Sequence, residues 1–348
     1  MRIIACMSGT SLDGLDIAFC EFNTSSYSIN YDIINAITFK YTDEWEHKLR
    51  NAPKLSGLEL KVLDNAYGLL LADFINIFIK KNKLSNIDYI SSHGHTVFHQ
   101  TEKNITLQIG DALSIASSTN IPVINDFRSL DVCLNGQGAP LVPIGDQLLF
   151  SEYHYCLNLG GFSNVSFSQD TKRIAFDIAP VNLILNYYSR VLGFDFDNDG
   201  KIGAKGELIP SLLLELNEIE YYKRTAPKSL GAEWLDRNFF PLIQKHYKVE
   251  DILRTLYEHI AVQIGNVLCK KNSQTLVTGG GAFNSFLIQR IKVYSKSEII
   301  LPKKELIDFK EALIFGLLAY LRASNKINVL KSVTGAKRDS CSGNIILP

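Results

Sequence analysis

The sequence predicts an α/β protein built from two structurally repeated domains. The chain has 348 residues, more than one hydrophobic core usually serves. Short apolar runs of strand character alternate with segments of helical periodicity. The order strand, glycine-rich or polar turn, strand, strand and helix occurs at residues 2–82 and again at residues 155–192. Sequence identity between the two segments is negligible, so the repeat is one of element order. We therefore expect mixed β-sheets flanked by helices in both halves.

The first half opens with three predicted strands and a polar turn. Residues 2–7 and 17–22 have strand composition and enclose a turn at residues 9–14, and residues 31–39 supply the third strand. A helix follows, because apolar residues recur at three- and four-residue spacing from Leu60 to Phe78. Strands at residues 88–92, 105–109 and 122–125 and a helix from about Ala112 complete this half.

The second half begins in the same way. Strands are predicted at residues 155–159, 165–167 and 173–177, with a Gly/Asn turn at residues 160–164 and a helix at residues 182–192. A helix at residues 257–269, a strand at 275–278, a glycine turn opening a further helix and a last helix at 311–321 follow. Residues 130–145 hold three Gly and two Pro and are the predicted crossover. We assign residues 1–128 to an N-terminal domain and residues 129–348 to a C-terminal domain, with the last helix free to pack back on the first domain.

Composition narrows the class of protein. Hydrophobic residues make up 46% of the chain, and Lys plus Arg (36) equals Asp plus Glu (36), so no net charge recruits nucleic acid or an anionic membrane. The six cysteines form no C-x-x-C pair, which is typical of buried thiols in a reducing compartment. The N-terminus lacks a leader pattern, and the longest apolar stretch, residues 312–321, is about half of a membrane span. We expect a cytoplasmic enzyme.

The first polar turn has the composition of an anion site. Gly9 and Gly14 let the backbone approach a phosphate closely, and the hydroxyls of Thr10 and Ser11 add donors. Asp13 could orient Mg²⁺ through a water molecule. An ordinary hairpin turn with a capping Asp is the alternative, because this motif is not a P-loop.

Two further glycine turns lie in the second half. Gly160 and Gly161, flanked by Asn158 and Asn164, offer a second phosphate-type hairpin. A triple glycine between a strand and a helix suits a flat surface against a planar adenine ring; these residues are Gly279, Gly280 and Gly281, with Asn284 following. A plain hairpin and a flexible strand-to-helix turn are the respective alternatives.

The stretch from Met7 to Asp16 resembles the signature of the anhydro-N-acetylmuramic acid kinases. Matches continue in family order at residues 92–96, 108–111, 126–128, 136–143, 158–164, 176–177, 199–200, 227–229, 279–284 and 311–312. The resemblance implies an actin/sugar kinase/Hsp70-type fold with ATP and Mg²⁺ in a cleft between the domains, and a homodimer. It also implies a role in peptidoglycan recycling, in which the 1,6-anhydro ring of the sugar is opened and O6 is phosphorylated, giving N-acetylmuramic acid 6-phosphate.

This reaction requires a general base for the attacking water. Asp177 stands at the end of a predicted strand at the family's base position, and a helix N-cap is its alternative role. Glu311 matches the family's late Glu-Ala motif and could support the same site, or it could be an exposed glutamate at the start of a helix.

Polar residues of the first half are candidates for binding the sugar. They are His93, Thr96, Asp111, Asp126 and Arg128. A buried ion pair is the alternative for the last two, and an N-cap is the alternative for Asp111. His93, His95 and His99 also form an H-x-H-x-x-x-H cluster that could bind a metal, but no further ligand is evident, and we favour sugar binding.

The chain departs from the family pattern beside the expected base. Where the family has Thr-Gly-Pro-Gly-Asn, residues 178–182 read Ile-Ala-Pro-Val-Asn, and Phe283 replaces a common His. A kinase for a related anhydrosugar, or a non-catalytic nucleotide-dependent sugar-binding or sensor protein, is the alternative function. An ATP-driven activator of electron-transfer enzymes is disfavoured, because such proteins need cysteines that hold a cluster.

Overall fold

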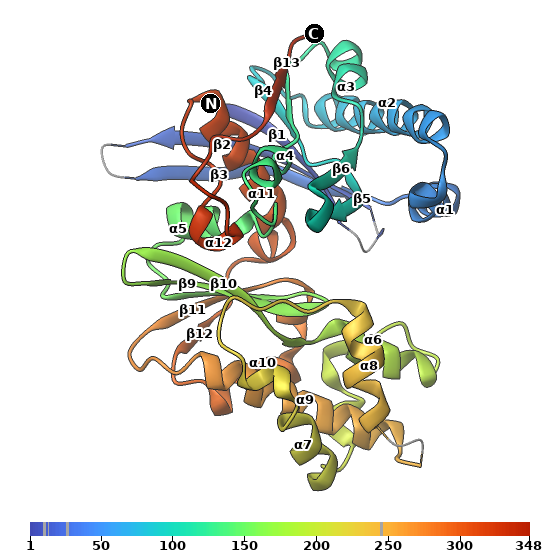
Figure 1. Ribbon diagram of the computed structural model, residues 1–348, viewed down its shortest axis with the longest axis vertical. Coiled ribbons are helices and arrows are strands. Elements are labelled where there is room, and N and C mark those ends of the chain that lie inside the picture. The colour runs from blue at the N-terminus through green and yellow to red at the C-terminus, as the bar shows by residue number, and fades with distance from the viewer. Residues whose placement is uncertain (10–11, 13, 26–27, 244–245) are drawn as a thin grey trace. The chain divides into compact units, whose positions relative to one another are not determined.

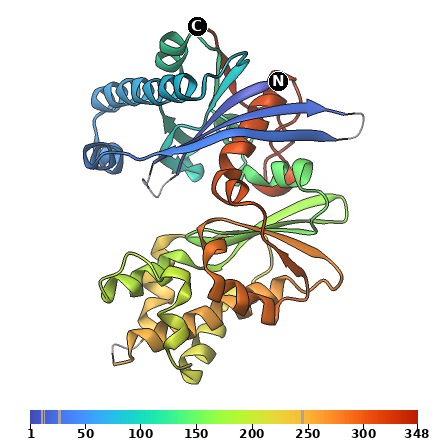
Figure 2. The same cartoon turned by 180° about the vertical axis from the view of Figure 1, so that it is seen from behind.

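The computed structural model describes residues 1–9, 12, 14–25, 28–243 and 246–348. The chain divides into two compact units (Figures 1 and 2). The first unit comprises Met1–Leu149 and Phe309–Pro348, and the second comprises Phe150–Asp308.

The first unit is built on a mixed sheet. Its strands are β1 (Arg2–Ser8), β2 (Leu15–Thr24), β3 (Ile29–Phe39), β4 (Tyr89–Ser92), β7 (Val123–Asn125) and β13 (Asn344–Ile346). Within the described residues the order is β13-β7-β4-β1-β2-β3. Strands β1, β4 and β7 run parallel, whereas β2 is antiparallel to both β1 and β3. A separate antiparallel pair consists of β5 (His95–Gln100) and β6 (Ile105–Ile109).

The helices of the first unit are α1 (Asp43–Asn51), α2 (Gly57–Asn82), α3 (Ala112–Thr119), α4 (Ser129–Cys133), α5 (Val142–Leu149) and α12 (Lys331–Thr334). The part of α11 (Lys304–Ala323) from Phe309 onward also belongs to this unit. Helix α2 starts with a capping box, in which Ser56 and Glu59 each bond the backbone N–H of the other. Its inward side chains Tyr67, Leu71 and Ile75 are fully buried in the core with β1 and β2.

Among the described residues, α2 is also the helix that is long and apolar enough to cross a membrane by length and composition. The same composition arises when one face of a long helix packs in a core. Tyr67, Leu71 and Phe78 lie on such a face, since they recur at helical spacing and are buried. Core packing therefore accounts for the buried part of this apolar composition, while Leu58, Val62, Leu69 and Ile77 of α2 are exposed.

The second unit contains a sheet of the same kind. Its strands are β8 (Tyr155–Leu159), β9 (Phe162–Gln169), β10 (Lys172–Pro180), β11 (Gln274–Thr278) and β12 (Glu298–Ile300). Within the described residues they lie in the order β10-β9-β8-β11-β12. The β8–β9 and β9–β10 pairs are antiparallel, and β8, β11 and β12 run parallel.

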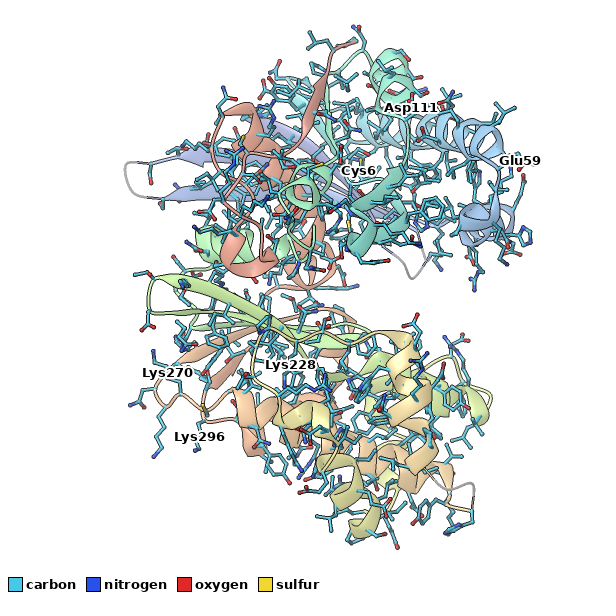
Figure 3. All side chains as sticks on the ribbon, viewed as in Figure 1. Cys6, Glu59, Asp111, Lys228, Lys270 and Lys296 are labelled. Atoms are coloured by element: carbon cyan, nitrogen blue, oxygen red, sulfur yellow. The ribbon has the colours of Figure 1, made fainter. Side chains whose placement is uncertain are left out.

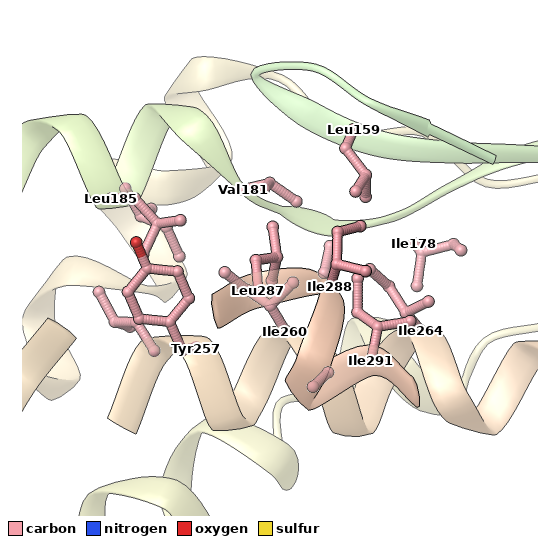
Figure 4. Close-up of a cluster of buried hydrophobic side chains, with 14 of the residues drawn as sticks. Leu159, Ile178, Val181, Leu185, Tyr257, Ile260, Ile264, Leu287, Ile288 and Ile291 are labelled. Atoms are coloured by element: carbon pink, nitrogen blue, oxygen red, sulfur yellow. The ribbon is translucent and has the colours of Figure 1, made fainter. Parts of the chain in front are cut away.

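One face of this second sheet is covered by helices. They are α6 (Asn182–Val191), α7 (Pro210–Asn217), α8 (Ala232–Asn238), α9 (Val249–Val267) and α10 (Ser285–Tyr294). The core lies between the sheet and α9 and α10, where Leu159 and Ile178 face Ile260, Ile264 and Ile288 (Figure 4). Burial of these aliphatic side chains is the main stabilising contribution, at about 25 cal/mol for each Å² of apolar surface removed from water.

The predicted repeat is confirmed by strand order. Starting from the edge, β3-β2-β1-β4-β7 in the first unit corresponds to β10-β9-β8-β11-β12 in the second, with the same sequence of antiparallel and parallel pairings. Each unit is therefore an antiparallel meander of three strands followed by parallel strands, flanked by helices.

The division between the units differs from the predicted boundary after residue 128. Residues 129–149 group with the first unit, because α4 and α5 are tied into it. Asp131 in α4 accepts a hydrogen bond from Thr334 Oγ1 at 2.7 Å, and Gly145 in α5 packs directly on Ile314. The residues of α11 from Phe309 onward group with the first unit as well.

The cysteines follow the expectation only in part. The six cysteines form no disulfide within the described residues, and Cys6, Cys20 and Cys156 are buried. Cys133 and Cys269 are exposed, so burial does not hold for every thiol.

Candidate active site

A row of polar residues crosses the second sheet at the end where its glycine turns lie. Asp177 of β10 is paired with Asn164 of β9, Asn164 with Asn158 of β8, and Asn158 with Thr278 of β11. Side chains that are directly paired across strands point to the same face of a sheet. The neighbouring Leu159 lies in the core, so this polar row faces away from the helices.

Asp177 is held in place by contacts on its backbone and side chain. Its Oδ2 accepts a hydrogen bond from Leu230 N at 2.9 Å, and its carbonyl oxygen accepts one from Tyr221 Oη at 2.7 Å. Its N–H donates to the carbonyl of Lys228 at 3.2 Å. Burial raises the pKa of the Asp177 carboxyl, and the Leu230 N–H partly offsets this rise. A partly buried carboxylate with a raised pKa is suited to accept a proton. The alternative role of Asp177 as a helix cap does not apply, because the N-cap of α6 is Val181.

A β-bulge adjoins Asp177. The register between β9 and β10 shifts after the Asp177–Asn164 pair, and Ala179 is then paired with Ser163. Ser163 Oγ bridges the shift by donating to the Ala179 carbonyl at 3.0 Å and accepting from the Ala179 N–H at 3.2 Å. Ile178, the extra residue, points into the core.

The second hairpin and the triple glycine are neighbours in the second unit. A Cβ on Gly279, which has φ of 83°, would lie 2.5 Å from Asn158 Oδ1 and 2.9 Å from the Leu159 carbonyl carbon. A Cβ on Gly281 would lie 2.8 Å from Leu159 Cβ. Asn182, at the start of α6, donates its amide to the Leu159 carbonyl at 3.2 Å. Only glycine permits this close approach of the two turns.

A cavity of about 230 Å³ opens beside the triple glycine. Gly280 and Gly281 form part of its lining, and the aromatic rings of Phe196 and Phe283, both largely exposed, flank it. Asn186 and Asp199 add polar groups to the lining. A glycine surface between exposed aromatic rings has the shape and chemistry to hold a planar heterocycle.

Asn284, a predicted nucleotide ligand, has a structural role in this cavity. Its Oδ1 accepts the Leu287 N–H at 3.0 Å as the N-cap of α10, and its amide donates to Tyr257 Oη at 2.8 Å. The Asn284 side chain thus fixes the cavity wall, because its strongest hydrogen-bonding groups are already engaged.

The first hairpin lies in the first unit. Gly9 and Gly14 are described, whereas Thr10, Ser11 and Asp13 lie outside the described residues. A Cβ on Gly14 would lie 2.5 Å from the Phe39 carbonyl oxygen, so the close packing of this turn against β3 requires glycine. The turn joins β1 to β2, as the sequence predicted.

Buried His93 pairs with half-buried Arg128 in the first unit. His93 Nε2 accepts hydrogen bonds from Arg128 Nε at 3.1 Å and Nη2 at 2.9 Å, which leaves Nδ1 to donate to the Gly94 carbonyl at 2.9 Å. Burial, and then the charge of Arg128, lower the pKa of His93 to about 3. Arg128 also donates to the Gly138 carbonyl at 2.6 Å and lies over the Phe315 ring. The pair is a rigid, singly charged platform.

Glu311 lies on α11, in the part that belongs to the first unit. Its side chain reaches solvent, yet the dense protein around it raises its pKa, while the charges of Arg128 and Lys310 act in the opposite direction. Arg128, predicted to bind the sugar, therefore interacts electrostatically with Glu311, predicted to support the base.

The alternative role of Asp126 and Arg128, a buried ion pair, is absent from the described contacts. Asp126 Oδ1 instead accepts the Ser129 N–H at 3.2 Å, and its Oδ2 accepts from the Asn344 amide at 3.5 Å. Arg128 makes its bonds to His93 and Gly138. Asp126 therefore holds the start of α4, and Arg128 faces the histidine.

Asp111 takes the alternative role that the sequence allowed. Its Oδ2 accepts the Ser114 N–H at 2.7 Å as the N-cap of α3, and its Oδ1 binds Lys61 Nζ at 2.9 Å (Asp111 is labelled in Figure 3). Both oxygens are engaged in joining α2 to α3, so this carboxylate is a structural group.

Thr96 and the other histidines lie on the small β5–β6 sheet. Thr96 Oγ1 accepts a hydrogen bond from Gln108 at 3.3 Å, and His99 contacts Thr106 Oγ1 at 3.1 Å. His95 is buried, and its Nδ1 has no partner among the described residues. In the part of the chain that the structure describes, no group of three or more His, Cys, Asp and Glu side chains could hold a metal ion. The H-x-H spacing does not place His93 and His95 on one face of a strand, because Gly94, with φ of 72°, separates His93 from β5.

Sequence reasoning missed three residues of the site. Thr278 ends β11 in the polar row, and its Oγ1 is buried with no partner among the described residues. Asn182 links the two glycine turns, and Leu230 binds the carboxylate of Asp177. The position of Thr278 directly before Gly279 could have indicated that it belongs to the site. Leu230 acts through its backbone N–H, so its residue type gives no such indication.

Two repeated units of this topology, with glycine turns at the ends of the central strands, define the actin/sugar kinase/Hsp70 class of fold. Within that class, the family model for anhydro-N-acetylmuramic acid kinase matches residues 1–348. The chain belongs to this family.

Relatives that match this chain over nearly its full length carry the name of the same family. The anhydro-N-acetylmuramic acid kinase of Mannheimia succiniciproducens is 35% identical, covering 99% of this chain and 98% of the relative. A protein of that name from Bacillus cereus is 30% identical with full coverage of both chains. Among solved structures, (R)-2-hydroxyglutaryl-CoA dehydratase component A of Acidaminococcus fermentans is similar with a TM-score of 0.46 and 12% identity, covering 93% of this chain and 99% of that one.

Proposed function

We propose that the protein is an ATP-dependent kinase that hydrolytically opens the 1,6-anhydro ring of anhydro-N-acetylmuramic acid and phosphorylates O6. Water adds to the anomeric carbon while O6 leaves that carbon and takes the γ-phosphoryl group of ATP. The products are N-acetylmuramic acid 6-phosphate and ADP. Membership of the family supports this substrate, since relatives over the full length carry that name.

The observation that carries the proposal is the placement of Asp177. Its carboxylate stands in the same row as Asn164, Asn158 and Thr278, next to the glycine turns. In our proposal Asp177 takes the proton of the attacking water, and its raised pKa makes it a stronger base than a solvated aspartate.

The glycine turns would bind the nucleotide. In our proposal the donors for the phosphate oxygens are the backbone N–H groups of Gly9, Gly14, Gly160 and Gly161 and the side-chain amides of Asn158 and Asn164. Thr10 and Ser11 remain candidate donors that lie outside the described residues. The cavity beside Gly280 and Gly281 would take the adenine ring. The hydroxyl of Thr278, which has no partner among the described residues, is a further donor for a ligand at this end of the sheet.

Mg²⁺ belongs to the proposal as the ion that neutralises charge on the transferring phosphoryl group. The described residues contain no cage of metal ligands, which fits an ion held mainly by phosphates and water. Asp13 is the candidate water-mediated ligand and lies outside the described residues.

The first unit would bind the sugar. Arg128 and His93 present one positive charge in a rigid setting, which suits the lactyl carboxylate of the substrate. Thr96 adds a hydroxyl, and Glu311 a carboxylate attracted to Arg128. We place the reaction in the cytoplasm, as befits a recycling enzyme, and expect a homodimer.

The departure from the family pattern after Asp177 has a packing explanation. Ile178, Ala179 and Val181 are buried in the hydrophobic core of the second unit. Side chains in the core do not contact a ligand at the polar row, so these replacements favour retained kinase activity over the sensor alternative.

Mass spectrometry of the purified protein incubated with ATP, Mg²⁺ and the anhydrosugar tests the proposal. A product heavier than the sugar by one phosphoryl group (HPO3) plus one water supports it. ATP binding without product would favour the non-catalytic sensor, and turnover of another anhydrosugar alone would favour the related kinase.

A further inference from the structure

A second cavity, of about 320 Å³, lies in the second unit on the helix-covered face of its sheet, opposite to the polar row. Ile174 and Phe176 of β10 and Phe167 of β9 form one wall, and Gln263 and Asn266 near the end of α9 form another. Phe176 and Asp177 are consecutive in a strand, so their side chains point to opposite faces. This cavity is therefore separate from the polar row.

Two cations border the cavity. Arg224 and Lys228 belong to the segment that closes its rim, residues 224–230, which we call the strap. Their neighbour Lys223 binds Glu218 at 2.8 Å, but neither Arg224 nor Lys228 makes an ion pair with a described residue. Lys228 Nζ lies 4.8 Å from the centre of the Tyr221 ring and 5.6 Å from that of Phe176 (Lys228 is labelled in Figure 3).

The charged form of the Lys228 side chain is disfavoured in this setting. Burial, and then the charge of Arg224, lower its pKa. Its one described hydrogen bond is a long one, 3.3 Å to the Tyr221 carbonyl. Two neighbouring cations without a carboxylate are stabilised when an anion binds between them.

The opposite wall is rigid and carries amides. Buried His259 accepts a hydrogen bond from Tyr222 Oη at 2.9 Å and donates to Asn217 at 2.7 Å, which fixes the Tyr222 ring in the lining. Gln263 donates its amide to the same Asn217 oxygen at 2.8 Å, so its carbonyl oxygen is left to accept from a ligand. Asn266 and Gln169 add further amide groups.

We propose that this cavity is a regulatory site for a small sugar phosphate. Arg224 and Lys228 would bind the phosphate, the amides of Gln263 and Asn266 the hydroxyl groups, and the ring of Phe176 the apolar face of the sugar. Each of these pairings is the ordinary recognition chemistry of its group. The cavity volume of about 320 Å³ suits one phosphorylated monosaccharide.

The strap connects this cavity to Asp177. The Lys228 carbonyl accepts the Asp177 N–H, and the Leu230 N–H binds the Asp177 carboxylate. A phosphate that draws the Arg224 and Lys228 side chains into the cavity moves the same short segment and disturbs both bonds. Occupancy therefore lowers kcat, and this part of the inference rests on the proposed function of Asp177.

Binding can be measured without catalysis, because Trp234 reports on this region. The chain has two tryptophans, and Trp234 contacts Tyr221 and Tyr222, with ring centres 5.4 and 6.4 Å away. The variant Trp45→Phe leaves Trp234 as the fluorescent group. Glucose 6-phosphate is the probe, with N-acetylglucosamine 6-phosphate, glucose and inorganic phosphate as comparison arms.

We expect a saturable fluorescence change with both sugar phosphates, at least about tenfold tighter than with glucose or phosphate alone. Arg224→Gln in the same background should weaken binding about tenfold, whereas Arg190→Gln, an exposed arginine on α6, should not. No saturable change, or equal weakening by both variants, would overturn the site. Equal affinity for inorganic phosphate would reduce it to a simple anion site and overturn the sugar phosphate assignment.

The regulatory part has its own test. With saturating glucose 6-phosphate, kcat should fall at least about twofold while KM for ATP stays unchanged, and Arg224→Gln should remove this effect. Binding in the fluorescence assay together with an unchanged kcat would overturn the coupling. If the anhydrosugar is not a substrate at all, the fluorescence assay still decides whether the site exists.

Discussion

Leu230 donates its backbone N–H to Oδ2 of Asp177 across 2.9 Å, although the two residues are 53 positions apart. One oxygen of the proposed base is thereby fixed, and the other stays available for a water molecule. The strap that contains Leu230 thus orients the carboxylate.

Replacing Asp177 with Asn should abolish turnover. The amide keeps the shape and can still accept the Leu230 N–H, but it cannot take a proton. We expect kcat to fall by about 10² to 10⁴, with nucleotide affinity unchanged. Steady-state kinetics and nucleotide titration measure the two quantities. Asp170→Asn, in the turn between β9 and β10, is the matched control, and near-normal turnover of the Asp177 variant would remove this residue from the mechanism.

The same replacement should stabilise the protein at neutral pH. Burial raises the pKa of Asp177 in the folded state, so the folded state prefers the protonated form. The stabilisation from that preference is present below the unfolded pKa of about 3.9 and is lost as the pH rises through the folded pKa. The amide of the Asp177→Asn variant is neutral at every pH, so the Tm of the variant at pH 7 should exceed that of the parent, and the difference should shrink toward pH 3. A lower Tm at pH 7 would contradict this account.

Replacement of two glycines by alanine should distinguish the cost of backbone strain from the cost of a steric clash. Gly279 and Gly193 share φ of 83°, but a Cβ meets Asn158 and Leu159 only at Gly279, and nothing within 4 Å at Gly193. Gly193→Ala should destabilise the protein by about 1 kcal/mol through strain alone. Gly279→Ala should cost more stability and weaken nucleotide binding. Urea unfolding and nucleotide titration of both variants are the measurements, and equal losses would argue against the close approach of the two turns.

The buried histidine of the second unit should make stability depend on pH. Burial lowers the pKa of His259 to about 3, so the folded state keeps this imidazole neutral. The unfolded chain binds a proton below its pKa of about 6.5, so stability falls as the pH drops from about 6.5 toward about 3. Between pH 7 and pH 5 the loss from this residue should be about 2 kcal/mol.

Urea unfolding at the two pH values measures this slope. His259→Gln should flatten it, although the variant is less stable overall because Tyr222 and Asn217 lose a partner. His47→Gln, a replacement of an exposed histidine on α1, is the comparison variant. An equal slope in the parent and in His259→Gln would show that this imidazole is not the titrating group.

Much of the fold was predictable because its strongest signals are local. The first strands of both units, the helix from Leu60 to Phe78 and the glycine turns follow from composition and periodicity. The second turn proved shorter than predicted, since β9 begins at Phe162. Helix α9 starts at Val249 rather than residue 257, because its polar first turns hide the apolar period.

The parts that could not be predicted depend on tertiary contacts. Strand β5 was missed because its histidines and polar residues resemble a loop, and its pairing with β6 decides its conformation. Asp111 and Asn284 were assigned to ligands although both cap helices, because Asp and Asn serve either purpose. The bond from Leu230 to Asp177 involves the backbone of a distant loop, so the residue type carries no trace of it.

The bulge at Ile178 divides β10 into two stretches, of which the first positions Asp177 and the second leads to α6. Upstream, register with β9 decides which way Asp177 points, while downstream Ala179 and Pro180 deliver the chain to the start of α6. Loss of a single residue there would invert the facing of every upstream side chain, sending the carboxylate toward the interior and Phe176 outward. We therefore expect a deletion or insertion at this point of β10 to be tolerated less well than a substitution.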